Sequence, residues 1–295
     1  MVGLAFSPLA SAQLTVLASI KPLQQIAAAV QDGVGTPDVL LPPGASPHNY
    51  ALRPSEVRRV AAADLLYWIG PDMEAFLQRP LAQRKLPTVA VQSLPELRLR
   101  HFSEDGQAHE EDADEHDHDH RPGSLDAHLW LDPVNARVIA RKMAADFAQA
   151  DPADAQRYTQ NLASFEQRLD QLDARLRERL AKVAHKPFFV FHEGFDYFEQ
   201  AYGLKHAGVF TVGGEVQPGA AHVAAMRARL TEAGSSCVFS EPPARPRLAE
   251  TLTAGLPVRL AELDALGGFS EASPTGYEAL LERLADNLAG CLEQL

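Results

Sequence analysis

The sequence predicts an α/β protein of two lobes, each built on a mostly parallel four-stranded sheet flanked by helices, with one long rigid helix joining the lobes. Apolar runs of strand length alternate with helical stretches in both halves of the chain. The runs are continuously apolar instead of alternating with polar residues, which is typical of strands in a parallel sheet that is covered on both faces. A long amphipathic stretch separates the two series of strands, and this is the expected joining helix.

We expect a first lobe at residues 13–150, the joining helix at 151–184 and a second lobe at 185–295. A further helix begins at Pro133, after the strands of the first lobe. The first lobe should contain strands at 14–19, 38–41, 64–69 and 87–91 and helices at 22–30, 54–62 and 71–79. The second should contain strands at 188–192, 206–212, 237–241 and 258–263 and helices at 194–201, 218–233, 244–254 and 275–293.

The joining helix has a start signal and an apolar seam. Asp151 is placed to cap the helix, and Pro152 suits its first position. The seam residues recur at spacings of four and three: Tyr158, Leu162, Phe165, Leu169, Leu172, Leu176 and Leu180. A helix over 152–183 would be roughly 45 Å long, enough to lie along both lobes. A dimeric coiled coil is the alternative, but the seam ends after about four heptads, so we expect it to pack on its own chain and the protein to be a monomer.

Composition and charge exclude some classes of protein. A chain of 295 residues that is 46% hydrophobic can bury a sizeable core. Its formal charge is −12, but nine of the 39 acids lie between Glu104 and Asp119, which leaves 30 acids against 27 basic residues elsewhere. The folded body is therefore close to neutral and lacks the excess of basic residues that nucleic-acid binding needs.

The first residues, MVGLAFSPLASAQL, contain a short apolar run followed by Ala10-Ser11-Ala12. This is the small-x-small pattern of a signal-peptidase site, although the usual basic start is missing. We expect residues 1–12 to be the remnant of a signal peptide and the mature protein to be exported. No apolar run reaches the roughly 20 residues of a membrane span.

The two cysteines, Cys237 and Cys291, are too few for a thiolate zinc site and lack C-x-x-C spacing. In an oxidising compartment they would form one disulfide between a strand and the last helix, worth on the order of 4 kcal/mol. Two unrelated buried thiols are the alternative.

A low-complexity insertion at 101–124 interrupts the first lobe. Its core, HEEDADEHDHDH, combines imidazoles and carboxylates, the ligand types that suit zinc. It has no apolar residue larger than Ala to fix a rigid site, so we expect disorder and weak, exchanging metal binding. The candidate accessory ligands are the histidines of this insertion: His101, His109, His116, His118 and His120. A merely solvated charged loop is the alternative.

Polar residues near the expected strand ends are better placed for a site. His48 follows the strand at 38–41, His128 lies in DAHLWLDP, His192 ends FFVFH, and Asp264 follows VRLAEL. Ligands of open parallel sheets bind beyond the carboxyl ends of the strands, so a cleft between the lobes would bring these groups together. Three imidazoles and one carboxylate form a tetrahedral shell suited to Zn²⁺. Glu241, at another strand end, is expected to hydrogen-bond a ligand.

Several motifs in chain order together resemble the periplasmic solute-binding proteins of bacterial zinc ABC importers, the ZnuA-like branch of the metal-binding cluster. They cover nearly the whole mature chain: ASIKPL, LLPPGASPHNYALRPS, DAHLWLDP, FHEGFDYF, EVQPG, CVFSEPP and LDALGG. The resemblance implies a periplasmic protein whose two lobes hold Zn²⁺ and hand it to a membrane permease. A periplasmic zinc chaperone is a candidate further partner.

The resemblance also implies roles for individual residues. It makes His48, His128 and His192 the imidazole ligands, with a carboxylate or water in the fourth position. Asp264 matches the position at which manganese-binding relatives use a carboxylate. Many zinc receptors have Glu before the first histidine, but Pro47 stands here, which increases the weight on Asp264 or water. The resemblance further implies the Cys237–Cys291 disulfide and the acidic histidine-rich loop.

The expected function is therefore high-affinity zinc capture and delivery, with the loop as a zinc collector or sensor, and not catalysis. A manganese or iron receptor on the same fold is one alternative. A zinc hydrolase is another, because three histidines with an open position also describe catalytic zinc. The segment after His192 has Asp196 where an H-E-x-x-H motif needs its second histidine.

Overall fold

The computed structural model describes residues 13–102, 123–211, 219–242, 247–268 and 270–295. The leader predicted at 1–12 lies outside these residues, as do four of the loop histidines, His109, His116, His118 and His120.

The first lobe is built on a parallel sheet of four strands in the order β2-β1-β3-β4. β1 and β3 are buried along their whole length, as expected of central strands covered on both faces. The strands are β1 (Val16–Ala18), β2 (Asp38–Val39), β3 (Leu65–Trp68) and β4 (Thr88–Ala90), and the helices among them are α1 (Lys21–Val30), α2 (Pro54–Ala62) and α3 (Gln78–Ala82).

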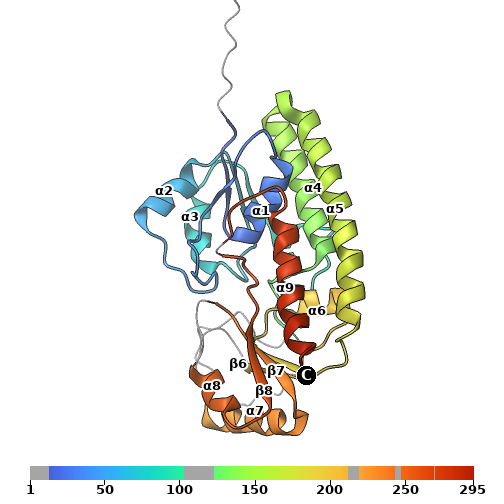
Figure 1. Cartoon of the computed structure of the whole chain (residues 1–295). Coiled ribbons are helices and arrows are strands. Elements are labelled where there is room, and N and C mark those ends of the chain that lie inside the picture. The colour runs from blue at the N-terminus through green and yellow to red at the C-terminus, as the bar shows by residue number, and fades with distance from the viewer. Residues whose placement is uncertain (1–12, 103–122, 212–218, 243–246, 269) are drawn as a thin grey trace, which may run out of the picture.

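The second lobe repeats this arrangement, with four parallel strands in the order β6-β5-β7-β8. The strands are β5 (Phe188–His192), β6 (Gly208–Thr211), β7 (Ser236–Ser240) and β8 (Val258–Glu262), and the helices among them are α6 (Asp196–Tyr202), α7 (Ala220–Ala233) and α8 (Arg247–Thr253). The predicted fold class, two α/β lobes joined by a long helix, is confirmed (Figure 1).

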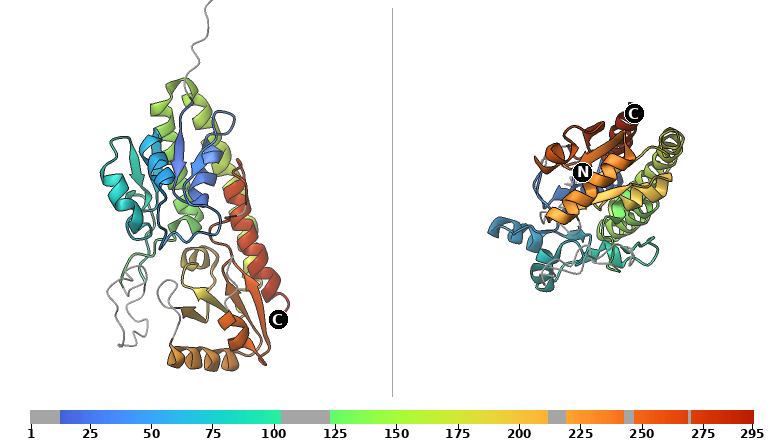
Figure 2. Two further views of the ribbon diagram at one scale, coloured as in Figure 1. Left: turned by 90° about the vertical axis from the view of Figure 1, so that its left-hand side faces the viewer. Right: turned by 90° about the horizontal axis from the view of Figure 1, so that it is seen from below.

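Three long helices lie beside the sheets: α4 (Pro133–Ala150), α5 (Ala155–Ala181) and α9 (Gly276–Leu292). α5 and α9 pack on elements of both lobes, and α4 packs on α1 and α5. α5 begins after a 3₁₀ turn at Pro152–Asp154 and extends from the first lobe down to α6 in the second (Figure 1). Its predicted seam is buried except for the partly buried Leu162, and it packs against α4, α1 and α9 of the same chain. The views in Figure 2 show α9 running beside this helical layer.

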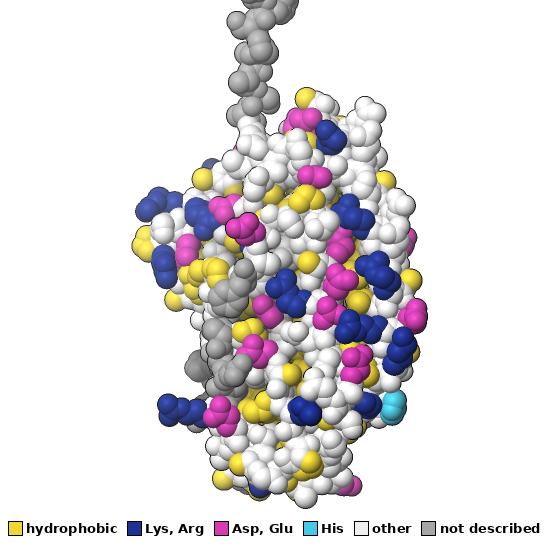
Figure 3. Space-filling view, viewed as in Figure 1, with side chains coloured by type: hydrophobic (Ala, Val, Ile, Leu, Met, Phe, Trp, Pro, Cys, Tyr) yellow, Lys and Arg dark blue, Asp and Glu magenta, His cyan; other side chains and the backbone are white. Residues whose placement is uncertain are grey.

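The faces of α5 and α9 that point to solvent carry charges of both signs (Figure 3). Three arginines of α5 pair with three acids of α9: Arg168 with Glu278, Arg175 with Glu282, and Arg179 with Asp286. The pairs of Arg175 and Arg179 are exposed and contribute up to about 1 kcal/mol each, so the buried seam contributes more than they do to holding the two helices together.

The helix predicted at 71–79 is wrong. The structure has a 3₁₀ turn at Ala75–Leu77 followed by the short α3. Glu74, just before the turn, has a non-helical backbone with φ −116° and ψ 53°. Its carboxylate turns back to accept the N–H of Ile69 at 2.6 Å, and its non-helical backbone separates the turn at 71–73 from the helical residues that follow.

One hydrophobic cluster extends through both lobes. It includes Val16 of β1, Leu169 of α5 and Cys237 of β7, so the two sheets are attached to a shared core. Cys237 is bonded to Cys291 of α9, which confirms the predicted disulfide; the two cysteines are 54 residues apart. Within the described ranges, none of the helices combines the length and the apolar character that crossing a membrane requires.

Candidate metal centre

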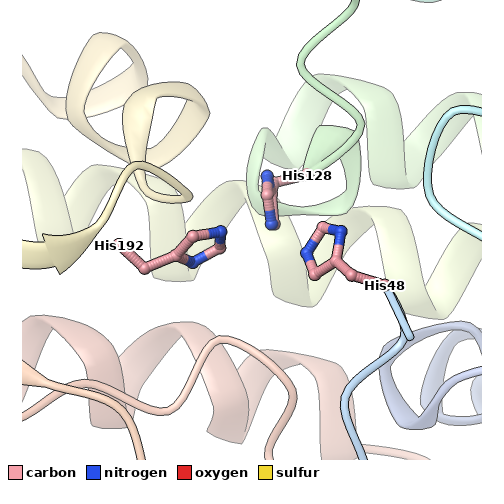
Figure 4. Close-up of side chains that lie close together, drawn as sticks. All are labelled: His48, His128 and His192. Carbon is pink, nitrogen blue, oxygen red and sulfur yellow. The ribbon is translucent and has the colours of Figure 1, made fainter. Parts of the chain in front are cut away.

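Three histidines from distant parts of the chain meet between the lobes (Figure 4). His48 lies in the connection between β2 and α2, His128 caps the 3₁₀ turn Leu129–Leu131 that leads into α4, and His192 is the last residue of β5. Their ring centroids are 4.9 to 5.5 Å apart. One nitrogen of each ring lies within 4.8 Å of the other two, so a single ion could contact all three.

Two of the imidazoles are oriented by buried or half-buried carboxylates. Nδ1 of His128 lies 2.9 Å from Oδ1 of Asp126, which also accepts the backbone N–H of His128 at 3.0 Å. Nδ1 of His192 lies 2.8 Å from Oε1 of Glu241, as expected for a carboxylate that supports a ligand. With Nδ1–H donated to a carboxylate, Nε2 of each ring keeps its lone pair for a metal.

The surroundings set the protonation of these groups. Burial, and then the neighbouring His192 and His48, lower the pKa of His128 well below its ordinary 6.5. Burial would lower the pKa of His192 too, but the carboxylates of Glu241, Asp126 and Glu193 together outweigh it and raise that pKa. Burial raises the pKa of Asp126 to about 6. His128 is therefore a neutral ligand at pH 7, whereas binding a metal at His192 competes with a proton.

Gly194 leaves the space in which the imidazoles meet. A Cβ at this position would lie 2.7 Å from Cε1 of His192 and 3.1 Å from Nε2 of His128. Any larger residue would push against both rings, so the absence of a side chain at 194 keeps the site open.

Asp264 does not join the three histidines. Its carboxylate accepts backbone N–H groups from its own loop: Leu266 at 3.0 Å, Gly267 at 2.7 Å and Gly268 at 3.2 Å. The group of ligand atoms within 4.8 Å of one another contains only the imidazoles of His48, His128 and His192. Asp264 as a fourth ligand stays a prediction.

The predicted accessory ligands are represented by one described residue. His101 is exposed and forms a bridge to Leu125 at the base of the histidine-rich insertion. It is not part of the three-histidine group.

Sequence reasoning missed Asp126 and Gly194. A carboxylate two residues before a candidate ligand is a usable signal, because that spacing lets one oxygen reach both the backbone N–H and the ring of the histidine. Gly194 offered a weaker signal: it lies two residues after the candidate ligand His192, where the absence of a side chain leaves space beside the ring.

Comparison with known proteins gives the chain its family. The model described as zinc-uptake complex component A periplasmic, ZnuA, matches residues 16–291. The high-affinity zinc uptake system protein ZnuA of Yersinia pestis is 38% identical, over 97% of this chain and 94% of its own length.

Solved structures share the fold. A crystal structure of ZnuA matches with a TM-score of 0.79 at 22% identity, covering 95% of this chain and 99% of that one. The periplasmic zinc binding protein TroA from Treponema pallidum matches with a TM-score of 0.78 at 19% identity, covering 95% of this chain and 99% of that one. The family match spans both sheets and all three clustered histidines, so this chain belongs to the ZnuA family of zinc-uptake complex components.

Proposed function

We propose that this protein captures Zn²⁺ in the periplasm with His48, His128 and His192 and delivers it to the membrane permease of an ABC importer. The convergence of three imidazoles, two of them oriented by carboxylates, carries the proposal. The ligands come from both lobes and are fixed by the fold, so little ordering is needed on binding. The protein acts as a binding protein that gives up an unchanged ion, and a periplasmic zinc chaperone is a candidate second partner.

The fourth position falls to a solvent molecule or to Asp264. The three backbone hydrogen bonds of Asp264 favour solvent, because coordination would take the carboxylate away from them. Asp264→Asn separates the two. If Asp264 anchors its own loop and does not bind the metal, the zinc affinity of the variant should stay close to that of the wild type, whereas loss of a charged ligand should weaken binding by more than about tenfold.

Zinc fits the site better than manganese or iron. The cluster consists of imidazoles, and harder ions prefer carboxylate and water ligands. The histidine-rich insertion, including His101, adds weak sites that collect zinc or report its abundance.

Calorimetric titration with Zn²⁺ and Mn²⁺ tests the proposal on the full chain. The His48→Ala, His128→Ala, His192→Ala triple variant should lose one tight zinc site, while His185→Ala, a histidine outside every metal-compatible group of the described residues, should keep it. Tight zinc binding in the triple variant would contradict the assignment. Zinc uptake by vesicles that carry the permease, supplied with each zinc-loaded variant, tests delivery.

A further inference from the structure

A second set of metal-ligating side chains lies at α6, separate from the three histidines. Asp196 and Glu199 are three residues apart, on one face of the helix, and His206 lies in the connection between α6 and β6. One ligand atom from each of these three residues lies within 4.8 Å of the other two. Two carboxylates and an imidazole form a mixed oxygen and nitrogen set that suits borderline divalent ions.

The geometry of the group is compact and fixed by the backbone. Nδ1 of His206 lies 2.9 Å from Oε1 and 3.0 Å from Oε2 of Glu199, and the backbone N–H of His206 donates to Oε2 at 3.0 Å. The side chain of Glu199 is 5% exposed, that of His206 14% and that of Asp196 18%. Glu199 is therefore the most deeply buried of the three, and His206 and Asp196 are exposed enough for an ion from solvent to reach them.

Among the described residues, one carboxylate oxygen of Asp196 has no hydrogen-bond donor. Its Oδ1 pairs with Arg100 at 3.2 Å, but Oδ2 is shielded from solvent and accepts no hydrogen bond from the part of the chain that the structure describes. A buried carboxylate oxygen left in this state costs free energy, and a cation is one means of satisfying it. The nearby negative charge of Glu199 adds to this cost when Asp196 is ionised.

We propose that Asp196, Glu199 and His206 form a second divalent-cation site, weaker than the three-histidine site and filled after it. Arg100 neutralises part of the charge of Asp196, and a proton on His206 satisfies Glu199 when the metal is absent. Both effects lower the metal affinity of this second site, so it fills after the three-histidine site. The alternative is a simple His206–Glu199 ion pair that binds protons and no metal.

The imidazole of His206 reports on the site directly. Full-length protein labelled with ¹⁵N-histidine is first loaded with one equivalent of Zn²⁺ at pH 7.5 and then titrated with further Zn²⁺ while the ring nitrogens are followed by NMR. The His206 signal is identified by its loss in His206→Gln. Asp196→Asn removes the charge at nearly constant shape, and Asp170→Asn is the control, because Asp170, like Asp196, pairs with an arginine from a separate segment, Arg137 of α4.

We expect the His206 signal to shift and saturate after the first equivalent in the wild type and in Asp170→Asn, and to need at least tenfold more zinc in Asp196→Asn. A signal that follows pH but not zinc overturns the proposal, even where the insertion takes up zinc. So does an equal response in Asp196→Asn, which would show adventitious binding to one histidine. If the three-histidine assignment is wrong, that failure appears separately, because the first equivalent of Zn²⁺ would then not bind tightly at those histidines.

Discussion

Substituting Gly194 by Ala tests whether the space between the imidazoles matters, because it changes none of the three histidines. The added Cβ would lie 2.7 Å from Cε1 of His192. Carbon atoms in contact lie about 3.5 Å apart, so the ring must move by about 0.8 Å. Metal–ligand distances tolerate about 0.2 Å, several times less than this movement. We expect the zinc dissociation constant to rise about 10- to 100-fold, the range typical of ligands that lose their support.

The assay is competition for zinc against a chromophoric chelator at pH 7.5, with thermal unfolding by circular dichroism as a check on folding. Gly290→Ala is the matched control, because a Cβ at position 290 would meet no heavy atom of the described residues within 4 Å beyond its chain neighbours and the backbone of its own helix. The control should bind zinc as the wild type does. Affinity within twofold of the wild type in Gly194→Ala would refute the reasoning, since it would mean that the rings do not meet where the structure places them.

Four further outcomes are expected. Glu241→Gln should weaken zinc binding about 10- to 100-fold at pH 7.5 and move the acid loss of affinity to lower pH in the same titration, because the carboxylate raises the pKa of the histidine it holds; an unchanged pH profile would argue against that role. Burial raises the pKa of Glu74 from 4.5 to about 7, so its contribution to stability is complete below about pH 4.5 and is lost as the pH rises through 7. The free energy of unfolding of the wild type should therefore fall by on the order of 2 kcal/mol between pH 5 and 8 through this group, and Glu74→Gln should not show this fall. Urea unfolding at several pH values measures both, and parallel pH profiles would contradict the prediction. Replacing Cys237 and Cys291 by Ser should lower the free energy of unfolding by about 4 kcal/mol and leave zinc affinity unchanged, because the bond closes a long loop away from the imidazoles. Deleting 104–120 should lower zinc stoichiometry in calorimetry and keep the tight site, whereas loss of tight binding would move the function to the insertion.

Much of the fold could be predicted because the signals are local and redundant. The strand ending at His192 is a continuous apolar run, and the seam of α5 keeps its helical spacing over the whole element, so burial confirms both. The helix at 71–79 failed because the backbone of Glu74 is not helical and separates the turn at 71–73 from the helical residues that follow, and no periodicity in the sequence encodes that break.

The candidate site divides in the same way. The meeting of His48 and His192 followed from their positions after β2 and at the end of β5, since the topology of a parallel sheet brings such ends together. His128 joins them from the start of the 3₁₀ turn before α4 and directly follows no strand of the described residues. The backbone contacts of Asp264 could not be predicted, because they depend on how its own loop closes. A carboxylate at a strand end is thus a ligand or a loop anchor according to local geometry that sequence position does not determine.

The shared core explains why three ligands from separate connections can form one site. His128 and His192 are attached to α4 and β5, and both elements contribute side chains to the hydrophobic cluster that also includes β1 and α5. Opening the lobes as rigid halves would expose much of this cluster to water, at about 25 cal/mol for each Å² of apolar surface. Moving the connection that carries His48 would expose far less, because that segment lies outside the strands and is only partly buried. Displacing the connection that carries His48 would therefore expose less apolar surface than separating the lobes, and it would leave the other two imidazoles attached to the shared core.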